Sequence, residues 1–194
     1  MEVSEINCSK ELRELFLMQQ IYSTLIATTG KIGTNADKYY KGLTMRQYMT
    51  ILAILHIPSN ETTLNNIAHK LGTTKQNVKQ IVNAIEKKGY IIISPSETDK
   101  RAINIKITEI GMQVINEYSK LGVMFLADVF QEFDEKEMQV LWRLLKKLYR
   151  YDGQDDKGFQ ENVNDMLECD YSEQQKELLE SFARKRNGGN CHEL

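Results

Sequence analysis

A short stretch in the middle of the chain, TTKQNVKQIVNAIEKKG, combines lysine and amide side chains in a pattern that suits contact with nucleic acid. Lysine, asparagine and glutamine match the hydrogen-bonding groups of base edges in the major groove, and amides at a helix start can bind phosphate. No acidic residue occurs from Thr73 to Ile85, which is unusual for a face that meets only solvent, the alternative interpretation. The residues expected to contact DNA are Thr73, Thr74, Lys75, Gln76, Asn77, Lys79, Gln80 and Asn83.

A second charged stretch follows, SETDKRAINIKIT, in which residues 103–107 alternate between isoleucine and polar side chains. This alternation is typical of a strand with one buried face, so the polar tip before it lies on a hairpin. On such a tip, Arg101 can enter the minor groove, and Asp99 can orient its guanidinium by a charge-assisted hydrogen bond. The alternative is an ordinary solvated ion pair worth under about 1 kcal/mol. The residues expected at the DNA here are Asp99, Lys100, Arg101 and Lys106, the two lysines through phosphate.

Two amphipathic helices must position the amide-rich stretch. The first closes at Gly72, because glycine tolerates the left-handed backbone that ends a helix. The second starts at Thr73, which is spaced from Gln76 as in a capping box, and it ends at Gly89. Two short amphipathic helices joined at a glycine turn indicate a helix-turn-helix. The predicted elements are a helix-turn-helix over about 63–88 and a hairpin wing over about 90–107.

Long helices flank this module. Apolar residues at spacings of three and four predict a helix over about 8–29 that Gly30 can end, followed by a loop through GTNADKYYKG. Two further helices cover about 109–151, and their apolar side chains extend beyond a single face. A helical dimer interface is the simplest explanation for these additional apolar side chains. The expected fold class is mostly α with a small β-hairpin wing, a winged helix-turn-helix core flanked by long dimerisation helices.

Composition bounds the remaining possibilities. The chain has 194 residues, 41% apolar and 27% charged, enough to bury a core, and we expect neither a membrane span nor a secretory leader. Three scattered cysteines argue against a disulfide scaffold and fit a reducing cytoplasm. The three histidines are far apart, and the sequence contains no glycine-rich phosphate loop, no nucleophile motif and no cluster of carboxylates near a histidine. We therefore expect no metal, no cofactor and no enzyme activity.

Charge is distributed unevenly along the chain, although the net charge is only −2. Residues 63–106 contain eight lysines and arginines against three acids, which suits a surface that binds phosphate. Residues 152–194 contain eleven acids against five bases, with short apolar runs at helical spacing. We expect one domain over residues 1–151 and an acidic, partly helical C-terminal extension over residues 152–194.

Four stretches of the chain, LTMRQYMTILAIL, TLNNIAHKLGTTKQNVKQIVNAIEKKGYI, DKRAINIKIT and TEIGMQVI, resemble the MarR family of winged-helix transcription regulators. The most specific feature is the wing tip Asp99-Lys100-Arg101, followed by a strand and then by Thr108 and Gly111. The likeness covers about residues 8–151 and leaves the acidic extension outside. It implies a homodimer that binds a pseudo-palindromic operator in double-stranded DNA, with interlocking terminal helices. We expect a transcriptional regulator of this kind, acting as a repressor.

The resemblance also implies a signal, because members of this family often bind small aromatic acids between the DNA-binding and dimer parts. By position alone, Tyr22, Tyr48 and Met49 are candidates, and ordinary core packing is the competing interpretation. Cys8 precedes the first helix, whose amides would favour a reactive thiolate and suit a peroxide sensor, although a lone cysteine is more often inert. A function of another class stays open, that of a winged-helix adaptor that binds an acidic protein partner without an operator.

Overall fold

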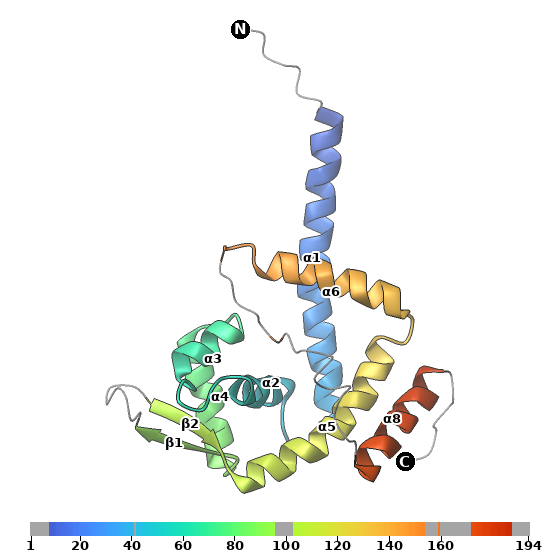
Figure 1. Cartoon of the computed structure of the whole chain (residues 1–194). Coiled ribbons are helices and arrows are strands. Elements are labelled where there is room, and N and C mark those ends of the chain that lie inside the picture. Colours follow the sequence, from blue (N-terminus) through green and yellow to red (C-terminus); the bar gives the residue numbers. More distant parts are fainter. Residues whose placement is uncertain (1–7, 41, 96–102, 154–158, 160–171, 188–194) are drawn as a thin grey trace.

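The computed structural model describes residues 8–40, 42–95, 103–153, 159 and 172–187 (Figure 1). Its elements are α1 (Cys8–Tyr39), α2 (Met45–Leu55), α3 (Leu64–Lys70), α4 (Lys75–Lys87), β1 (Ile91–Pro95), β2 (Ile103–Ile107), α5 (Glu109–Val129), α6 (Glu135–Tyr149) and α8 (Glu173–Arg186). Three short helices and the hairpin form one lobe, and α1 rises out of it. The described part of the chain therefore confirms the prediction of a mostly helical fold with a small hairpin.

The helices α2, α3 and α4 share one core because each carries an apolar stripe and begins at a threonine cap. Thr44 accepts a hydrogen bond from the Gln47 amide, and the Gln47 side chain accepts one from the Thr44 amide, which together form a capping box. Thr63 caps α3 by accepting a hydrogen bond from the Asn66 amide. The largest side chains of this core that are fully buried are those of Ile51, Ile67, Val78, Val82 and Ile85.

The first helix is longer than the sequence predicts. α1 continues through Gly30 and Gly33 to Tyr39, so the expected end at Gly30 and most of the expected loop after it are wrong. Neither glycine takes a positive φ. The last turns are drawn into the core, where Ala36 is 0% exposed and Tyr40, just beyond the helix, is 3% exposed. A glycine inside a helix costs about 1 kcal/mol of stability relative to alanine. The free energy gained by burying the last turns of α1 outweighs this cost.

The strands β1 and β2 form the predicted hairpin. They pair in antiparallel fashion, with Ile91 opposite Ile107. Ile105 is 1% exposed and the neighbouring Lys106 is exposed, so this part of the alternation is as predicted. The Ile105 amide also donates a hydrogen bond to the Thr62 carbonyl at 3.1 Å, which joins the hairpin to the linker between α2 and α3.

The helix α5 begins directly against the end of α4. The Thr108 hydroxyl accepts a hydrogen bond from the Gly111 amide and donates one to the Gly89 carbonyl at 2.7 Å. The Thr108 amide donates to the Tyr90 carbonyl at 3.0 Å. Gly111 packs so closely that a Cβ there would lie 2.1 Å from the Tyr90 oxygen. A short chain of backbone contacts therefore fixes the direction of α5.

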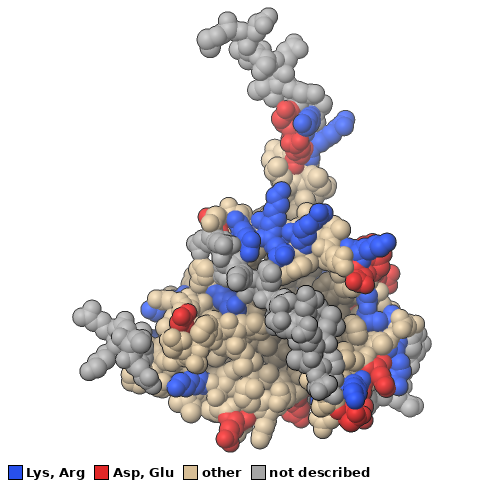
Figure 2. Space-filling view, viewed as in Figure 1, with Lys and Arg blue, Asp and Glu red and all other residues tan. Residues whose placement is uncertain are grey.

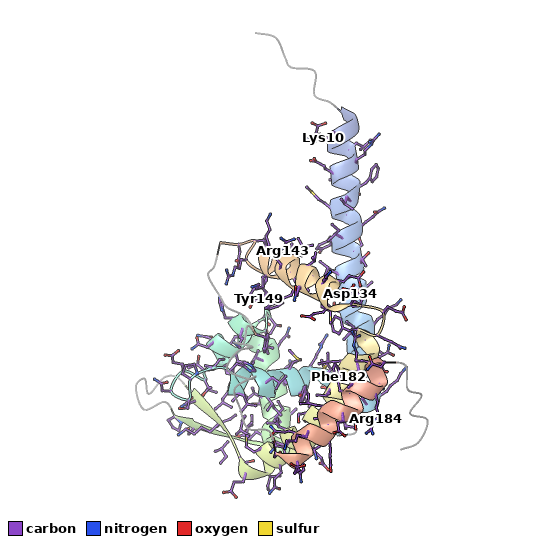
Figure 3. The ribbon with its side chains drawn as sticks, turned by 45° about the vertical axis from the view of Figure 1, so that its right-hand side comes forward. Lys10, Asp134, Arg143, Tyr149, Phe182 and Arg184 are labelled. Carbon is purple, nitrogen blue, oxygen red and sulfur yellow. The ribbon has the colours of Figure 1, made fainter. Side chains whose placement is uncertain are left out.

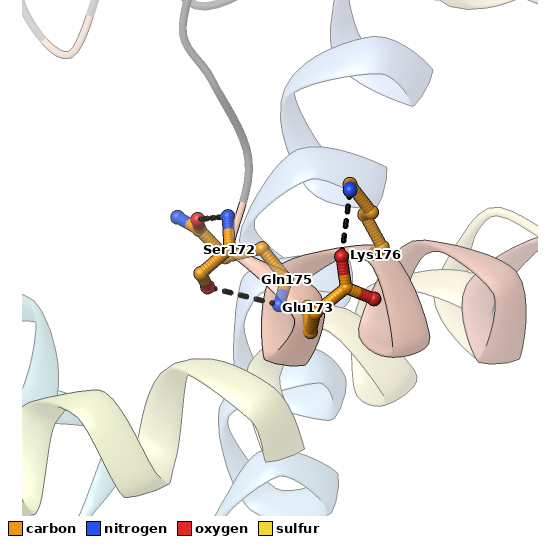
Figure 4. A network of polar contacts seen from close by, with 4 residues as sticks. All are labelled: Ser172, Glu173, Gln175 and Lys176. Atoms are coloured by element: carbon orange, nitrogen blue, oxygen red, sulfur yellow. Dashed lines mark hydrogen bonds and ion pairs between the residues drawn. The ribbon is translucent and has the colours of Figure 1, made fainter.

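The described part of the C-terminal extension contains the helix α8, one of the short helices that the apolar spacing predicts. It begins at a capping box in which the Ser172 hydroxyl accepts from the Gln175 amide and the Gln175 side chain accepts from the Ser172 amide (Figure 4). Lys176 pairs with Glu173 at 2.8 Å in the same turn. Further along, Phe182 is half-buried where α8 lies beside α5 (Figures 1 and 3).

The helices α1 and α6 expose many large apolar side chains. The N-terminal half of α1, around the labelled Lys10, stands clear of the other described helices in Figures 1 and 3, and α6 contains no buried residue. None of the described helices is both long and apolar enough to cross a membrane. The exposed apolar residues include Leu12, Phe16, Ile21 and Ile26 of α1 and Trp142, Leu144 and Leu148 of α6.

We expect Gly111→Ala to destabilise the protein by about 1–3 kcal/mol, because the added methyl group meets a backbone carbonyl that cannot rotate away. Gly30→Ala is the control. Nothing lies within 4 Å of its Cβ position, so alanine there should raise stability by up to about 1 kcal/mol. Urea unfolding followed by circular dichroism measures both changes. Equal stability of Gly111→Ala and wild type would contradict the close packing of α5 on Tyr90.

Candidate nucleic-acid interface

The polar side chains of α4 form one exposed face. Gln76, Gln80 and Asn83 recur at spacings of four and three, so they share the middle of this face. Lys75 and Lys79 are exposed along one edge of it. The opposite side of the helix is the buried stripe of Val78, Val82 and Ile85. The structure therefore brings five of the predicted DNA-contacting residues of α4 together on one surface, which we call the α4 face: Lys75, Gln76, Lys79, Gln80 and Asn83.

The α4 face continues to Lys87, a residue that the sequence reasoning did not single out. Lys87 is exposed and follows Asn83 by one helical turn, so its helical spacing was the signal that could have identified it. Lys88 is engaged elsewhere. Its Nζ donates to Gln47 Oε1 at 2.9 Å and also to the Gly42 carbonyl, which ties the end of α4 to the start of α2.

A glycine turn fixes the start of α4. Gly72 has a φ of +60°, and its amide donates to the His69 carbonyl at 3.0 Å. The Thr73 amide donates to the Ala68 carbonyl, also at 3.0 Å. This pair of bonds is the Schellman arrangement, which satisfies carbonyls at the end of α3 while turning the chain into α4.

A second glycine turn of the same kind fixes the end of α4. Gly89 has a φ of +75°, and its amide donates to the Glu86 carbonyl at 2.8 Å. The Tyr90 amide donates to the Ile85 carbonyl at 3.4 Å. The backbone of α4 is therefore anchored at both ends, and its exposed face keeps a fixed direction relative to the core.

The cap of α4 lies one residue later than expected. The sequence predicts a capping box of Thr73 and Gln76, but Thr74 is the cap and accepts from the Asn77 amide at 3.2 Å. The Thr73 hydroxyl instead accepts from the Asn77 side chain at 3.2 Å. Two adjacent threonines offer two cap positions with almost the same local pattern, and the turn at Gly72 selects the second. Asn77 is thereby directed toward the turn, and its contact with DNA stays a prediction.

The wing is described only at its base. Lys106 is exposed and stands opposite Ile92, which is 58% exposed. Their shared face therefore points away from the core, and the contact of Lys106 with a phosphate group stays a prediction. The wing-tip residues Asp99, Lys100 and Arg101 lie outside the described residues, so their roles stay predictions.

A buried polar cluster holds the base of the hairpin. The alternation predicts that Asn104 points outward, but it is only 9% exposed. Its Nδ2 donates to the Ser59 carbonyl at 2.7 Å, and its Oδ1 accepts from the Ile105 amide at 3.1 Å. The Thr62 hydroxyl contacts Asn104 Oδ1 and donates to the Ile105 carbonyl at 2.7 Å. The linker between α2 and α3 thus fixes β2, although no local pattern indicates this partnership.

A cavity of about 910 Å³ lies between α1, α3 and α6, next to the turn that precedes α4. Tyr22 lines it from α1, Thr73 from the turn, and Trp142 from α6. Tyr48 and Met49 are not among its lining residues. The structure therefore does not bring the three candidate ligand residues together, and their ligand roles stay predictions.

Tyr48 belongs to an aromatic cluster in the core. It is 8% exposed, and its ring stacks on that of Tyr40 with 5.0 Å between the centroids. The Tyr40 ring lies 5.4 Å from that of Tyr118. Burial and the neighbouring Tyr48 raise the pKa of Tyr40 to about 12, so this phenol stays neutral at physiological pH. For Tyr48 the geometry favours the packing interpretation.

The structure does not test the predicted redox role of Cys8. Cys8 is the first residue of α1, and the position of its side chain lies outside what the structure describes. Among the described residues, no three His, Cys, Asp or Glu side chains come together in a group that could hold a metal ion.

Comparison with known proteins points to one family. A family model described as "MarR family" matches residues 41–102, which contain α2, the helix-turn-helix and the first strand of the hairpin. The HTH-type transcriptional regulator PrsX of Escherichia coli is 27% identical over 107 residues, which cover 55% of this chain and 64% of PrsX. The chain therefore spans a little under two thirds of the length of that relative.

Solved structures share the fold. A MarR/EmrR family transcriptional regulator from Acinetobacter sp. ADP1 is 26% identical, with a TM-score of 0.60, and the match covers 77% of this chain and 99% of that protein. MepR of S. aureus, solved as a complex with DNA, is 21% identical, with a TM-score of 0.58 and coverage of 66% of this chain and 95% of MepR. At that identity, the likeness to MepR concerns the fold alone.

We expect Asn104→Ala to lower the free energy of unfolding by about 1–3 kcal/mol, because buried groups around Ser59 and Thr62 lose a hydrogen-bonding partner. Asn83→Ala is the matched control. Asn83 is exposed on α4, so its removal should change stability by less than about 0.5 kcal/mol. Urea denaturation at neutral pH compares the two variants. If both variants unfold at the wild-type midpoint, the cluster does not hold the hairpin.

Proposed function

The chain belongs to the MarR family of transcriptional regulators, and we propose that it binds double-stranded DNA in a sequence-specific manner as a homodimer. The observation that carries this proposal is the α4 face. It presents amide and lysine side chains, no acidic residue precedes Glu86 on the helix, and glycine turns anchor both ends. Such a face matches the donors and acceptors of base edges in the major groove.

The proposal assigns different contacts to different parts of the α4 face. Gln80 and Asn83 would read base edges from its middle, while Lys75 and Lys79 would neutralise phosphates along its edge. The amides near Thr74 would bind a backbone phosphate, as the start of a helix favours anions. The MepR complex with DNA supports this use of the fold. Arg101 at the wing tip would add a contact in the minor groove.

The homodimer is proposed from the uncovered apolar surfaces of α1 and α6. Trp142 is 44% exposed and Leu144 is 53% exposed on α6, and Phe16 is 55% exposed on α1. Lysines and arginines gather over α6 on another side of the helix, so α6 is amphipathic (Figure 2). Large apolar patches of this kind mark interfaces, and a second copy of the chain would cover them. A two-fold dimer would present two α4 faces to a pseudo-palindromic operator.

We infer that the protein acts as a repressor by occupying its operator, and that a small-molecule effector relieves this repression. The cavity between α1, α3 and α6 supports an effector because Thr73, which precedes α4, is one of its lining residues. A ligand placed there would contact the DNA-binding module directly. Tyr22 would offer it an aromatic surface. Oxidation of Cys8 stays a separate prediction.

We expect Lys75→Ala to reduce the salt dependence of DNA binding, lowering the slope of log K against log[salt] by about one unit, because one phosphate contact is lost. Lys136→Ala is the control, since Lys136 is also exposed but lies at the start of α6. Fluorescence anisotropy with duplex DNA at several salt concentrations measures the slopes. Equal slopes for Lys75→Ala and wild type would contradict a phosphate contact by Lys75.

The same titration separates the regulator from the adaptor. A regulator binds duplex DNA with strong salt dependence and a preference for particular sequences. An adaptor that binds an acidic protein partner would show no such preference. Wild-type protein that binds no duplex at low salt would favour the adaptor.

We expect Leu144→Glu to convert the dimer to a monomer with unchanged helical content, because Leu144 is exposed in the single chain but would be buried between two copies. The adjacent Arg143→Glu changes the basic side of α6 and should leave the dimer intact. Sedimentation velocity gives the mass of each variant, and circular dichroism checks its folding. A wild-type protein that sediments as a monomer at micromolar concentration would contradict the proposed dimer.

A further inference from the structure

The helix α8 ends against the elbow between α5 and α6, which we define as residues 130–134. The Arg186 guanidinium donates hydrogen bonds to the carbonyls of Phe130 and Phe133, the second at 2.5 Å. Lys185 Nζ lies 2.8 Å from Asp128 Oδ2 in the last turn of α5. Both basic side chains are half-buried. The end of α8 is therefore bonded to both sides of the point where the chain leaves α5.

The chemistry of a helix end explains why a cation sits at the elbow. The last carbonyls of a helix lack partners within the helix, and the helix dipole favours positive charge beside them. The planar guanidinium of Arg186 holds its donors in a rigid fork, so it can bind the Phe130 and Phe133 carbonyls together. The Phe133 amide also donates to the Phe130 carbonyl at 3.0 Å. Arg186 thus reinforces the turn that sets the direction of α6.

Asp128 joins three helices at the same place. It accepts hydrogen bonds from Tyr39 of α1 and from Lys185 of α8. Partial burial raises the pKa of Asp128, but the hydrogen bonds from Lys185 and Tyr39 outweigh this effect and hold the pKa below its ordinary value. Asp128 is therefore ionised at neutral pH, where it can bind both partners.

The helix α5 connects the contacts around Asp128 to the end of α4. At its start, Thr108 bonds the Gly89 and Tyr90 carbonyls at the turn that ends α4, and Gly111 packs against Tyr90. With 21 residues, α5 is about 30 Å long. Since its first turn is fixed to the end of α4, the angle at the elbow determines where α6 lies relative to the α4 face.

We propose that Lys185 and Arg186 are positioning residues for DNA binding, which act through the elbow to set the distance between the two α4 faces of the dimer. This inference rests on the proposed function, because that distance exists only if the chain dimerises and binds DNA. The C-terminal extension then acts, through α8, as a clamp that restricts the protein to one spacing of operator half-sites.

The test compares Arg186→Met and Lys185→Met with Arg184→Met as the matched control. Arg184 is exposed on the same helix and bonds Ser181 of that helix at 3.2 Å. Hydrogen exchange measured by mass spectrometry reports on the elbow amides, and we expect Arg186→Met to accelerate their exchange about tenfold or more. Arg184→Met should exchange as wild type does. Arg186→Lys keeps the charge but loses the fork, so it should fall between Arg186→Met and wild type.

The second readout is the affinity for two operator duplexes that differ by one base pair between the half-sites. We expect wild type to prefer one spacing, and Arg186→Met to reduce the ratio of the two affinities several-fold. Unchanged exchange at the elbow in Arg186→Met would overturn the clamp. Faster exchange with an unchanged ratio of affinities would show that Arg186 holds the elbow but does not affect the choice between operator spacings. If the wild-type protein binds no duplex selectively, the proposed function is wrong, and so is the proposed effect of Arg186 on DNA binding. Hydrogen exchange of the elbow amides would still show whether Arg186 holds the elbow.

Discussion

The turn at Gly89 and Tyr90 is the constraint on which the rest of the structure depends. It ends α4 with a positive φ at Gly89, its two carbonyls receive hydrogen bonds from Thr108, and Gly111 leaves room for the Tyr90 oxygen. The helices α4 and α5 and the hairpin all meet at this turn. Because backbone groups and the short Thr108 side chain make these bonds, the α4 face keeps its direction without depending on long, flexible side chains.

The helix at the other end of α5, α6, contains no buried residue. The winged-helix lobe has its own buried core and the polar cluster of Thr62 and Asn104, whereas α6 and the N-terminal half of α1 have little of the chain against them. A dimer would therefore join two lobes through α1 and α6, and the position of α6 would depend on the elbow. In the proposed dimer, the contacts of Arg186 with the elbow would let the C-terminal extension influence that geometry.

Local signals made much of the fold and of the α4 face predictable from the sequence. The cap at Thr108 and the turn at Gly72 depend on neighbouring residues, and helical spacing alone defines which side of α4 is exposed. Features that depend on distant partners were not predictable in this way. α1 continues past Gly30 because its last turns are buried, and Asn104 is buried because the α2–α3 linker supplies its partners. Arg186 binds carbonyls of the elbow between α5 and α6, which lies far from it in the sequence. The wing tip lies outside the described residues and stays a prediction.

The central claim is that two copies of the α4 face read the two halves of one operator. Selection of bound duplexes from a random DNA pool, run in parallel with wild type and Gln80→Ala, tests it most directly. Wild type should enrich a two-fold symmetric motif with half-sites about one helical turn apart. Gln80→Ala should lose base preference at a symmetric pair of positions and keep the rest of the motif. Enrichment of no motif by wild type, or of the same motif by both proteins, would contradict the account.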